Sequence, residues 1–320
     1  KDPSQIFYLS CELFPTFESL RETIKEISEF VKGEGFDEAF LFMDEATSLK
    51  GWWKGVKPLI DAGLLENFAI VITSSSSIKL KRDVELFPGR MGKGKKIEVL
   101  PLHFGKFVEV HGVKPKKTRA DEIMNLFRKY MEVGGLPSAL NGLPLEDVLS
   151  SFTGEIIKAG KSLEIAKEVM ASLISKIPSA LSYRAIASET SGYSYKVVQD
   201  YLETFRSLYL LDIAYLKEGN RILHRREKKF FFRDPLYLRL FSLWSGTKYL
   251  EASMYESIVQ EHLLRKFGEI YYYKNSQEID CIADGLKVEI KAGKPHRRYP
   301  RDVLVLDERE IPFFLIDLFK

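Results

Sequence analysis

The chain has 320 residues, 45% of them hydrophobic, which is enough to bury two or three cores of ordinary domain size. Its formal net charge is +3, so the overall charge argues neither for nor against a nucleic-acid partner. The two cysteines, Cys11 and Cys281, fit no zinc or disulfide spacing, and no apolar run approaches the ~18 residues of a membrane helix. We therefore expect a cytoplasmic protein of several domains without a membrane partner, and its many Lys, Arg and Glu residues are typical of thermophiles.

Residues 1–112 alternate strand and helix signals and predict the sheet core of an α/β domain. Residues 6–9 predict a first strand, and the apolar residues 40–43 predict a buried strand that ends at Asp44 and Glu45. Open parallel sheets bind their ligands at this end of the strands. Asp44 would hold Mg²⁺, directly or through water, and Glu45 would polarise an attacking water. The alternative is that both acids only end the strand and cap the next helix.

Two further polar features follow the next predicted strand, residues 68–72. Thr73 opens the run Thr-Ser-Ser-Ser-Ser, and Arg90 stands in Pro-Gly-Arg before a third apolar stretch, residues 97–102, which predicts another strand. A hydroxyl that senses the γ-phosphate and an arginine that neutralises it are parts of a nucleotide-hydrolysing site. Each feature has an ordinary alternative, a serine-rich turn or a solvated arginine. Their order along the chain favours the catalytic interpretation.

Four segments of the chain occur in an order that is typical of a known family: FLFMDEATSLKGWWKGVKPLIDAG, FAIVITSSSS, FPGRMGKGKKIEVLPLHFGKF and YMEVGGLPSAL. They resemble the prokaryotic AAA+ type ATPases common in archaea. The resemblance implies a P-loop NTPase-like parallel sheet, followed by a winged helix and a restriction-endonuclease-like α/β domain. It also implies ATP and Mg²⁺ as cofactors and catalytic roles for Asp44, Glu45, Thr73 and Arg90. The chain departs from the family beside the chemistry, at Ser74 where Gly is usual and at His103, Gly105 and Lys106.

The glycine loop that cradles phosphate in such an ATPase is not evident in the sequence. Residues 89–96 have its spacing but end in Lys instead of Ser or Thr and lead into a predicted strand. Residues 154–162 end in Gly-Lys-Ser but have one residue too many and follow helix-like sequence. The chain begins at Lys1 with the strand that follows the P-loop helix in the family. We therefore expect the P-loop to lie upstream and this chain to bind ATP poorly.

Residues 113–145 predict a basic, proline-bearing linker and a helical lid, and residues 146–250 predict a winged helix. In the winged helix, a short helix capped by Ser182 leads through a turn into a second helix over residues 195–208. Two strands joined by a Glu-Gly-Asn turn would form the wing.

The predicted winged helix offers two candidate contacts to nucleic acid. Its second helix would present Lys196 and Gln199 to base edges, although Asp200 and Glu203 share the outward face. The wing carries basic residues that suit phosphates: Arg221, His224, Arg225, Arg226, Lys228 and Lys229. DNA is therefore one candidate partner, and a solvated or interdomain surface is the alternative.

The C-terminal part, residues 251–320, predicts a PD-(D/E)xK nuclease-like domain. Asp280 lies on one strand of a hairpin, and Glu289 and Lys291 share one face of the returning strand. In such a site the two acids bind Mg²⁺, and the lysine orients or activates the attacking water. Glu256, on the preceding helix, matches the acid that the nuclease fold contributes from its first helix. The alternative is a fold that keeps these residues without cleaving nucleic acid.

The predicted function is an ATP-binding and ATP-hydrolysing AAA+ type enzyme linked to nucleic acid. The alternatives are a metal-dependent nuclease regulated by the ATPase part and a non-catalytic interaction scaffold. Arg90 would act in its own subunit or in a neighbour's, so a homo-oligomer is compatible with the sequence. The five histidines show no metal spacing, and we expect ordinary surface or buried positions for them.

Overall fold

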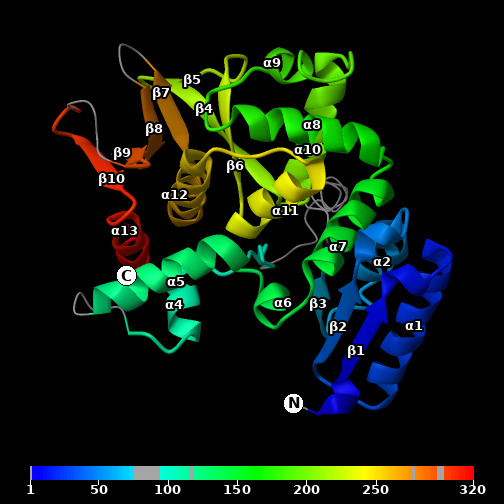
Figure 1. Ribbon diagram of the computed structural model, residues 1–320. Coiled ribbons are helices and arrows are strands. Elements are labelled where there is room, and N and C mark those ends of the chain that lie inside the picture. The colour runs from blue at the N-terminus through cyan, green and yellow to red at the C-terminus, as the bar shows by residue number, and fades with distance from the viewer. Residues whose placement is uncertain (1, 75–93, 115–118, 275–277, 294–298) are drawn as a thin grey trace. The chain divides into compact units, whose positions relative to one another are not determined.

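The computed structural model describes residues 2–74, 94–114, 119–274, 278–293 and 299–320 (Figure 1). The chain forms two compact units, Lys1–Glu98 and Val99–Lys320, and each is described by itself. The helix over Phe104–Val110, which the sequence assigns to the first domain, lies in the second unit.

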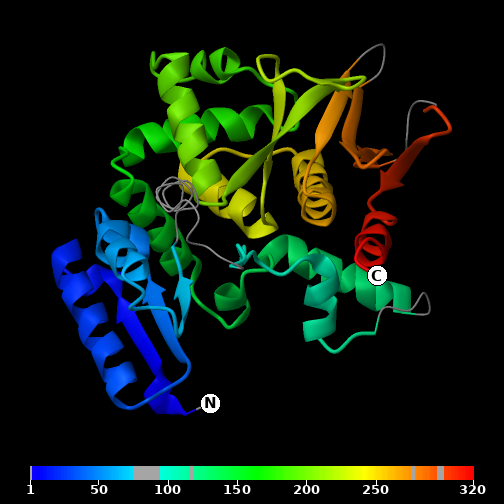
Figure 2. The ribbon, with the colours of Figure 1, turned by 180° about the vertical axis from the view of Figure 1, so that it is seen from behind.

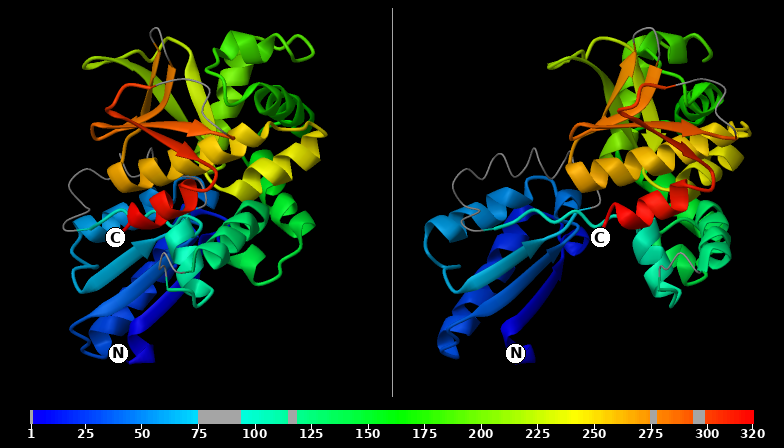
Figure 3. Two further views of the ribbon diagram at one scale, coloured as in Figure 1. Left: turned by 60° about the vertical axis from the view of Figure 1, so that its left-hand side comes forward. Right: turned by 90° about the vertical axis from the view of Figure 1, so that its left-hand side faces the viewer.

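The first unit contains a parallel three-stranded sheet in the order β1-β2-β3 (Figure 3). The strands predicted near residues 6–9, 40–43 and 68–72 are all present. The helices α1 and α2 pack against each other and share a core with Leu41 and Met43 of the central strand. The elements are η1 (Pro3–Gln5), β1 (Ile6–Ser10), η2 (Cys11–Leu13), α1 (Phe17–Gly33), β2 (Ala39–Asp44), η3 (Ala46–Ser48), α2 (Trp52–Asp61) and β3 (Phe68–Ile72).

Among the described residues, β3 pairs with β2 alone, so its other edge has no partner strand. Val71 on this strand is 42% exposed. The strand predicted over residues 97–102 does not form, and Ile97 and Val99 are 82% and 91% exposed. This prediction is wrong because an apolar segment becomes a strand only where another strand pairs with it, and the described part of the chain supplies none.

The second unit begins with helices that surround one large core. Ser182 caps α9 as predicted, since its side chain accepts a hydrogen bond from the Ala185 N–H at 3.1 Å. The second predicted helix of the winged helix is also present. The helices are α4 (Phe104–Val110), α5 (Ala120–Val133), α6 (Pro137–Leu140), α7 (Leu145–Lys158), α8 (Leu163–Lys176), α9 (Tyr183–Ala187), α10 (Tyr195–Ser207), α11 (Pro235–Ser245), α12 (Glu251–Phe267) and α13 (Ile311–Asp317).

A seven-stranded mixed sheet runs through the second unit in the order β10-β9-β8-β7-β4-β5, with β6 also paired to β4 (Figure 2). Tyr215 of β4 pairs in parallel with Tyr271 of β7. The wing strands and the C-terminal strands therefore belong to one sheet, and the sequence boundary near residue 250 does not separate two cores. The strands are β4 (Leu211–Glu218), β5 (Arg221–Ile222), β6 (Lys228–Phe232), β7 (Tyr271–Lys274), β8 (Glu278–Ala283), β9 (Leu286–Lys291) and β10 (Val303–Asp307).

Helix α12 packs against β6, β8 and β9 of this sheet. Its residues are buried from Ser253 to Leu263, including the polar residues Glu256, Glu261 and His262. A helix buried on all sides can hold charges only if each one meets a partner. This helix therefore brings the C-terminal acidic residues into contact with the wing strands.

Candidate functional site

The first candidate site lies where β2 and β3 of the first unit end. The hydroxyl of Thr73 donates a hydrogen bond to Oδ1 of Asp44, and the hydroxyl of Tyr8 donates one to Oδ2 at 2.5 Å. Tyr8 comes from the neighbouring strand β1. Three parallel strands therefore deliver one carboxylate and two hydroxyls to the same edge of the sheet, as the sequence predicts for Asp44 and Thr73.

The turn after Asp44 is held in an unusual backbone conformation. Glu45 has a φ of 48°, in the left-handed region that favours glycine. Its N–H donates to the Thr73 hydroxyl at 3.1 Å, and the next N–H, of Ala46, donates to the Thr73 carbonyl at 3.0 Å. These bonds fix the turn, so the backbone strain at Glu45 is supported by the neighbouring strand end.

The hydrogen bonds also set the charge of this corner. The hydroxyls of Thr73 and Tyr8 lower the pKa of Asp44, so its carboxylate is ionised at neutral pH. Burial, together with the charges of Asp44 and Glu45, raises the pKa of Cys11 to about 11. An ionised carboxylate is the ligand type that Mg²⁺ prefers, directly or through water. Both oxygens of Asp44 accept hydrogen bonds from hydroxyl groups, and its role in holding Mg²⁺ stays a prediction.

The remaining polar residues predicted near this site are Ser74, the three serines that follow it, and Arg90. Ser74 lies beside the corner, where its hydroxyl shares a 2.6 Å hydrogen bond with that of Thr47. Arg90 and the serines at 75–77 lie outside the described residues. The structure thus joins Asp44, Glu45 and Thr73, and the role of Arg90 stays a prediction.

Comparison with known proteins relates the N-terminal residues of the chain to an AAA domain. Residues 1–108 match the family model of the AAA domain. The chain is also 27% identical over 195 residues to the uncharacterized protein MJ1544 of Methanocaldococcus jannaschii, an alignment covering 53% of this chain and 42% of the relative. The chain thus spans less than half of that relative's length. No solved structure matches the chain. The resemblance to AAA-type ATPases therefore holds for the N-terminal residues.

The second candidate site lies in the second unit, where α12, β8 and β9 meet. The Asp280 N–H donates to Oε2 of Glu289 at 3.3 Å, and Lys291 donates to Oε1 of Glu289 at 2.5 Å. Glu256 reaches the same cluster through a shared partner, Lys229. The four positions predicted for the nuclease-like site are therefore brought together.

Lys229 is the residue that the sequence interpretation misplaced. The sequence predicts Lys229 on an exposed wing facing phosphate, but its side chain is only 2% exposed and its ammonium contacts Asp280 at 2.6 Å and Glu256 at 3.1 Å. Lys228 beside it is buried as well, with its ammonium 4.2 Å from the centre of the Tyr183 ring. Both predictions of phosphate contact are wrong, because all five residues of β6 are buried.

The acidic residues of this cluster already have hydrogen-bond donors as partners. Both oxygens of Asp280 accept hydrogen bonds, Oδ1 from Lys229 and Oδ2 from the Ile290 N–H at 3.0 Å. Oε1 of Glu289 accepts from Lys291 and from the Tyr299 hydroxyl. No set of three or more His, Cys, Asp or Glu side chains in the described parts of the chain is arranged to hold a metal ion. The role of Asp280 and Glu289 in holding Mg²⁺ stays a prediction.

The remaining nucleic-acid candidates are all exposed. Arg225 and Arg226 lie between β5 and β6, and Lys196 and Gln199 lie on α10. Asp200 of α10 forms an ion pair with Lys161. Their contact with nucleic acid stays a prediction. In the part of the chain that the structure describes, no helix is long and apolar enough to cross a membrane.

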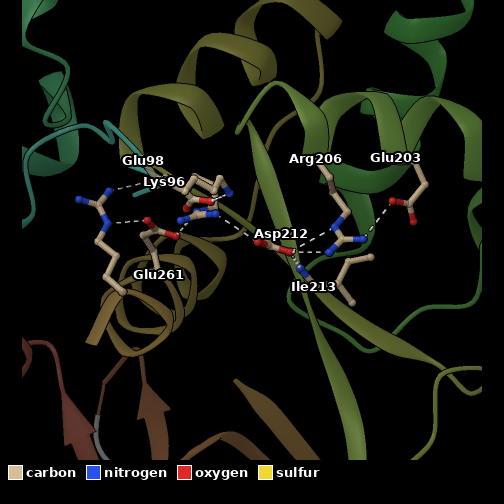
Figure 4. Close-up of polar contacts among 9 residues, drawn as sticks. Lys96, Glu98, Glu203, Arg206, Asp212, Ile213 and Glu261 are labelled. Atoms are coloured by element: carbon tan, nitrogen blue, oxygen red, sulfur yellow. Dashed lines mark hydrogen bonds and ion pairs between the residues drawn. The ribbon is translucent and has the colours of Figure 1, made fainter. Parts of the chain in front are cut away.

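A second buried ionic network was not predicted (Figure 4). Glu261 of α12 lies 2.5 Å from Nε of both Arg233 and Arg265, and Arg233 also pairs with Asp212 at 3.1 Å. Asp212 in turn pairs with Arg206 at 3.0 Å. The sequence feature that could have indicated this network is the run Lys-Lys-Phe-Phe-Phe-Arg-Asp, because charges beside buried apolar residues require buried partners.

His262 follows the ordinary interpretation of the histidines. Its ring is fully buried, and Nε2 accepts a hydrogen bond from the Phe104 N–H at 2.9 Å while Nδ1 bonds to the Ile258 carbonyl. Burial and the charge of Arg265 keep the pKa of His262 well below its usual range. The neutral ring therefore joins α4 to α12.

Proposed function

We propose that the natural protein is an AAA-type ATPase in which Asp44, Glu45 and Thr73 belong to the hydrolysis site. The observation that carries the proposal is the hydrogen bond from Thr73 to Asp44 across the ends of two parallel strands. Asp44 would hold Mg²⁺, and Glu45 would orient the attacking water. Thr73 would sense the γ-phosphate, and Arg90 would neutralise it.

The edge of β3 away from β2 supports the same proposal. A strand that carries a phosphate-binding loop fits beside β3, where the backbone groups have no strand partner among the described residues. Such a strand would end at the same side of the sheet as Asp44 and Thr73, because parallel strands present their carboxyl ends together. The exposed Val71 would then become buried.

Isothermal titration calorimetry of the full-length natural protein with ATP and Mg²⁺ tests this function. We expect micromolar binding that weakens at least tenfold, about 1.4 kcal/mol, in Asp44→Asn or when Mg²⁺ is chelated. Glu66→Gln, an exposed acid of the same unit, is the matched control and should bind as the wild type does. Absence of ATP binding, or binding that ignores both Mg²⁺ and Asp44, would contradict the proposal.

Nucleic acid is the proposed partner, with Arg225 and Arg226 as contacts. Two observations support this proposal. Both arginines are exposed next to the β4–β5 hairpin, and the order of helices before this hairpin is typical of winged helices. Because the buried Lys228 and Lys229 take no part, the basic surface is smaller than the sequence predicts.

A further inference from the structure

The carboxylate cluster between α12 and β8 contains its own cation. The ammonium of Lys229 lies 2.6 Å from Oδ1 of Asp280, 2.9 Å from Oε1 of Glu278 and 3.1 Å from Oε2 of Glu256. A lysine ammonium has three N–H donors, and here three carboxylates surround it. Each donor of Lys229 therefore has an acceptor.

The burial of this lysine requires such an arrangement. Its side chain is 2% exposed, and an isolated ammonium in that position would be strongly disfavoured. Although burial opposes the charged form, the carboxylates of Glu256, Asp280 and Glu278 surround the ammonium and offset that cost. The lysine is therefore charged, and a positive charge already lies where three acids converge.

The remaining acceptors of the cluster are also taken. Oδ2 of Asp280 accepts from the Ile290 N–H, and Oε2 of Glu289 accepts from the Asp280 N–H. Oε1 of Glu289 accepts from Lys291 and Tyr299. A divalent ion bound to Asp280 and Glu289 would have to displace these donors and approach the Lys229 ammonium, which repels it.

We propose that Lys229 is the resident cation of this cluster and stands in place of a divalent metal ion. The wild-type cluster then binds no Mg²⁺ or Mn²⁺, and removing the ammonium converts it into a divalent-cation site built from Glu256, Asp280 and Glu289. The lysine also connects β6 to α12 and β8, so the cluster fastens the wing strands to the C-terminal strands. This inference concerns the second unit and is independent of the proposed ATPase function.

Charge balance supports the proposal. Four acids, Glu256, Glu278, Asp280 and Glu289, face two lysines, Lys229 and Lys291. The two lysines thereby supply part of the neutralisation that a metal ion supplies in other carboxylate clusters.

Calorimetric titration with MnCl₂ tests the proposal, with Mn²⁺ as the probe because carboxylates suit this ion. All proteins carry Asp44→Asn so that the first candidate site contributes no heat. We expect Lys229→Met to bind Mn²⁺ at least tenfold more tightly than Lys229→Arg, which keeps the charge. The gain should vanish when Asp280→Asn is added. Lys274→Met, an exposed lysine, serves as the control and should gain nothing.

Two results would overturn the proposal. One is a folded Lys229→Met protein, verified by circular dichroism, that gains no Asp280-dependent Mn²⁺ binding. The other is Mn²⁺ binding with Lys229 intact that disappears in Asp280→Asn, because metal and ammonium would then coexist. This second comparison needs no lysine variant, so it decides the matter even if Lys229→Met does not fold.

Discussion

The backbone N–H of Gly135 donates a hydrogen bond to the buried carboxylate of Asp234 at 2.8 Å. The same carboxylate caps α11 by accepting from the Leu236 N–H at 2.9 Å. The carbonyl of Gly135 accepts from the Leu102 N–H at 2.7 Å. The Gly-Gly-Leu-Pro segment thus joins the residues before α4 to the start of α11, within the second unit.

Substitution of Gly135 by alanine should destabilise the protein strongly. A Cβ at this position would lie 2.0 Å from the carbonyl oxygen of Leu102, which is backbone and cannot move aside cheaply. We expect a loss on the order of 2–4 kcal/mol in the free energy of unfolding, measured by urea denaturation.

Gly154 provides the control for that experiment. It lies inside α7, and no atom lies within 4 Å of an added Cβ. Gly154→Ala should therefore stabilise the protein by roughly 0.5–1 kcal/mol through helix propensity. Equal effects of the two substitutions would refute the close approach at Gly135.

The stability of the second unit should depend on pH through Glu256. Its pKa is about 8 in the folded state and about 4.5 in a solvated chain, so the folded state binds more protons between these values. The contribution of Glu256 to stability is therefore fully present below pH ~4.5 and declines as the pH rises to about 8.

Urea unfolding of Glu256→Gln beside the wild type at pH 5, 6.5 and 8 measures this effect. The free energy of unfolding of the wild type, relative to that of Glu256→Gln, should be highest at pH 5 and should fall toward pH 8. The exposed Glu308→Gln should show no such trend. An advantage that grows with pH would mean that Glu256 is ionised in the folded protein.

The two arginines of the wing should govern binding to DNA. The double variant Arg225→Ala, Arg226→Ala removes two exposed charges, so duplex affinity should fall, and the slope of log K against log salt should drop by about 2. Fluorescence anisotropy at several salt concentrations gives both quantities. Lys158→Ala with Lys167→Ala removes two other exposed charges and should leave DNA binding intact. Equal losses in the two double variants would speak against specific contact by the wing.

Local patterns predicted the elements and several contacts of this protein. Apolar runs followed by Asp44 and Thr73 predicted where two strands end. Because parallel strands share one carboxyl edge, they also predicted that these two residues meet. The alternation around Asp280 and Glu289 likewise predicted two paired strands. Both are consequences of residue order within short segments.

The sequence could not show how distant segments pair. Lys229 looked like a wing residue because its neighbours in the chain are basic, yet β6 is covered by α12 and the lysine meets Glu256 and Asp280. That contact depends on a helix and a strand 27 and 51 residues away. The residues of β6 alone do not reveal that Lys229 meets these acids. The sequence therefore predicts a metal ion at the place where the Lys229 ammonium lies.

ATP turnover by the full-length natural protein and its Glu45→Gln variant tests the central claim most directly. Glu45 follows the Asp44 strand end in a backbone conformation fixed by Thr73, so its carboxylate is the proposed base for the attacking water. We predict that the variant still binds ATP with Mg²⁺ but turns it over about 10²–10⁴-fold more slowly, while the Glu66→Gln control keeps the wild-type rate. Turnover that is unchanged in Glu45→Gln would contradict the assignment of this corner as an ATP-hydrolysing site.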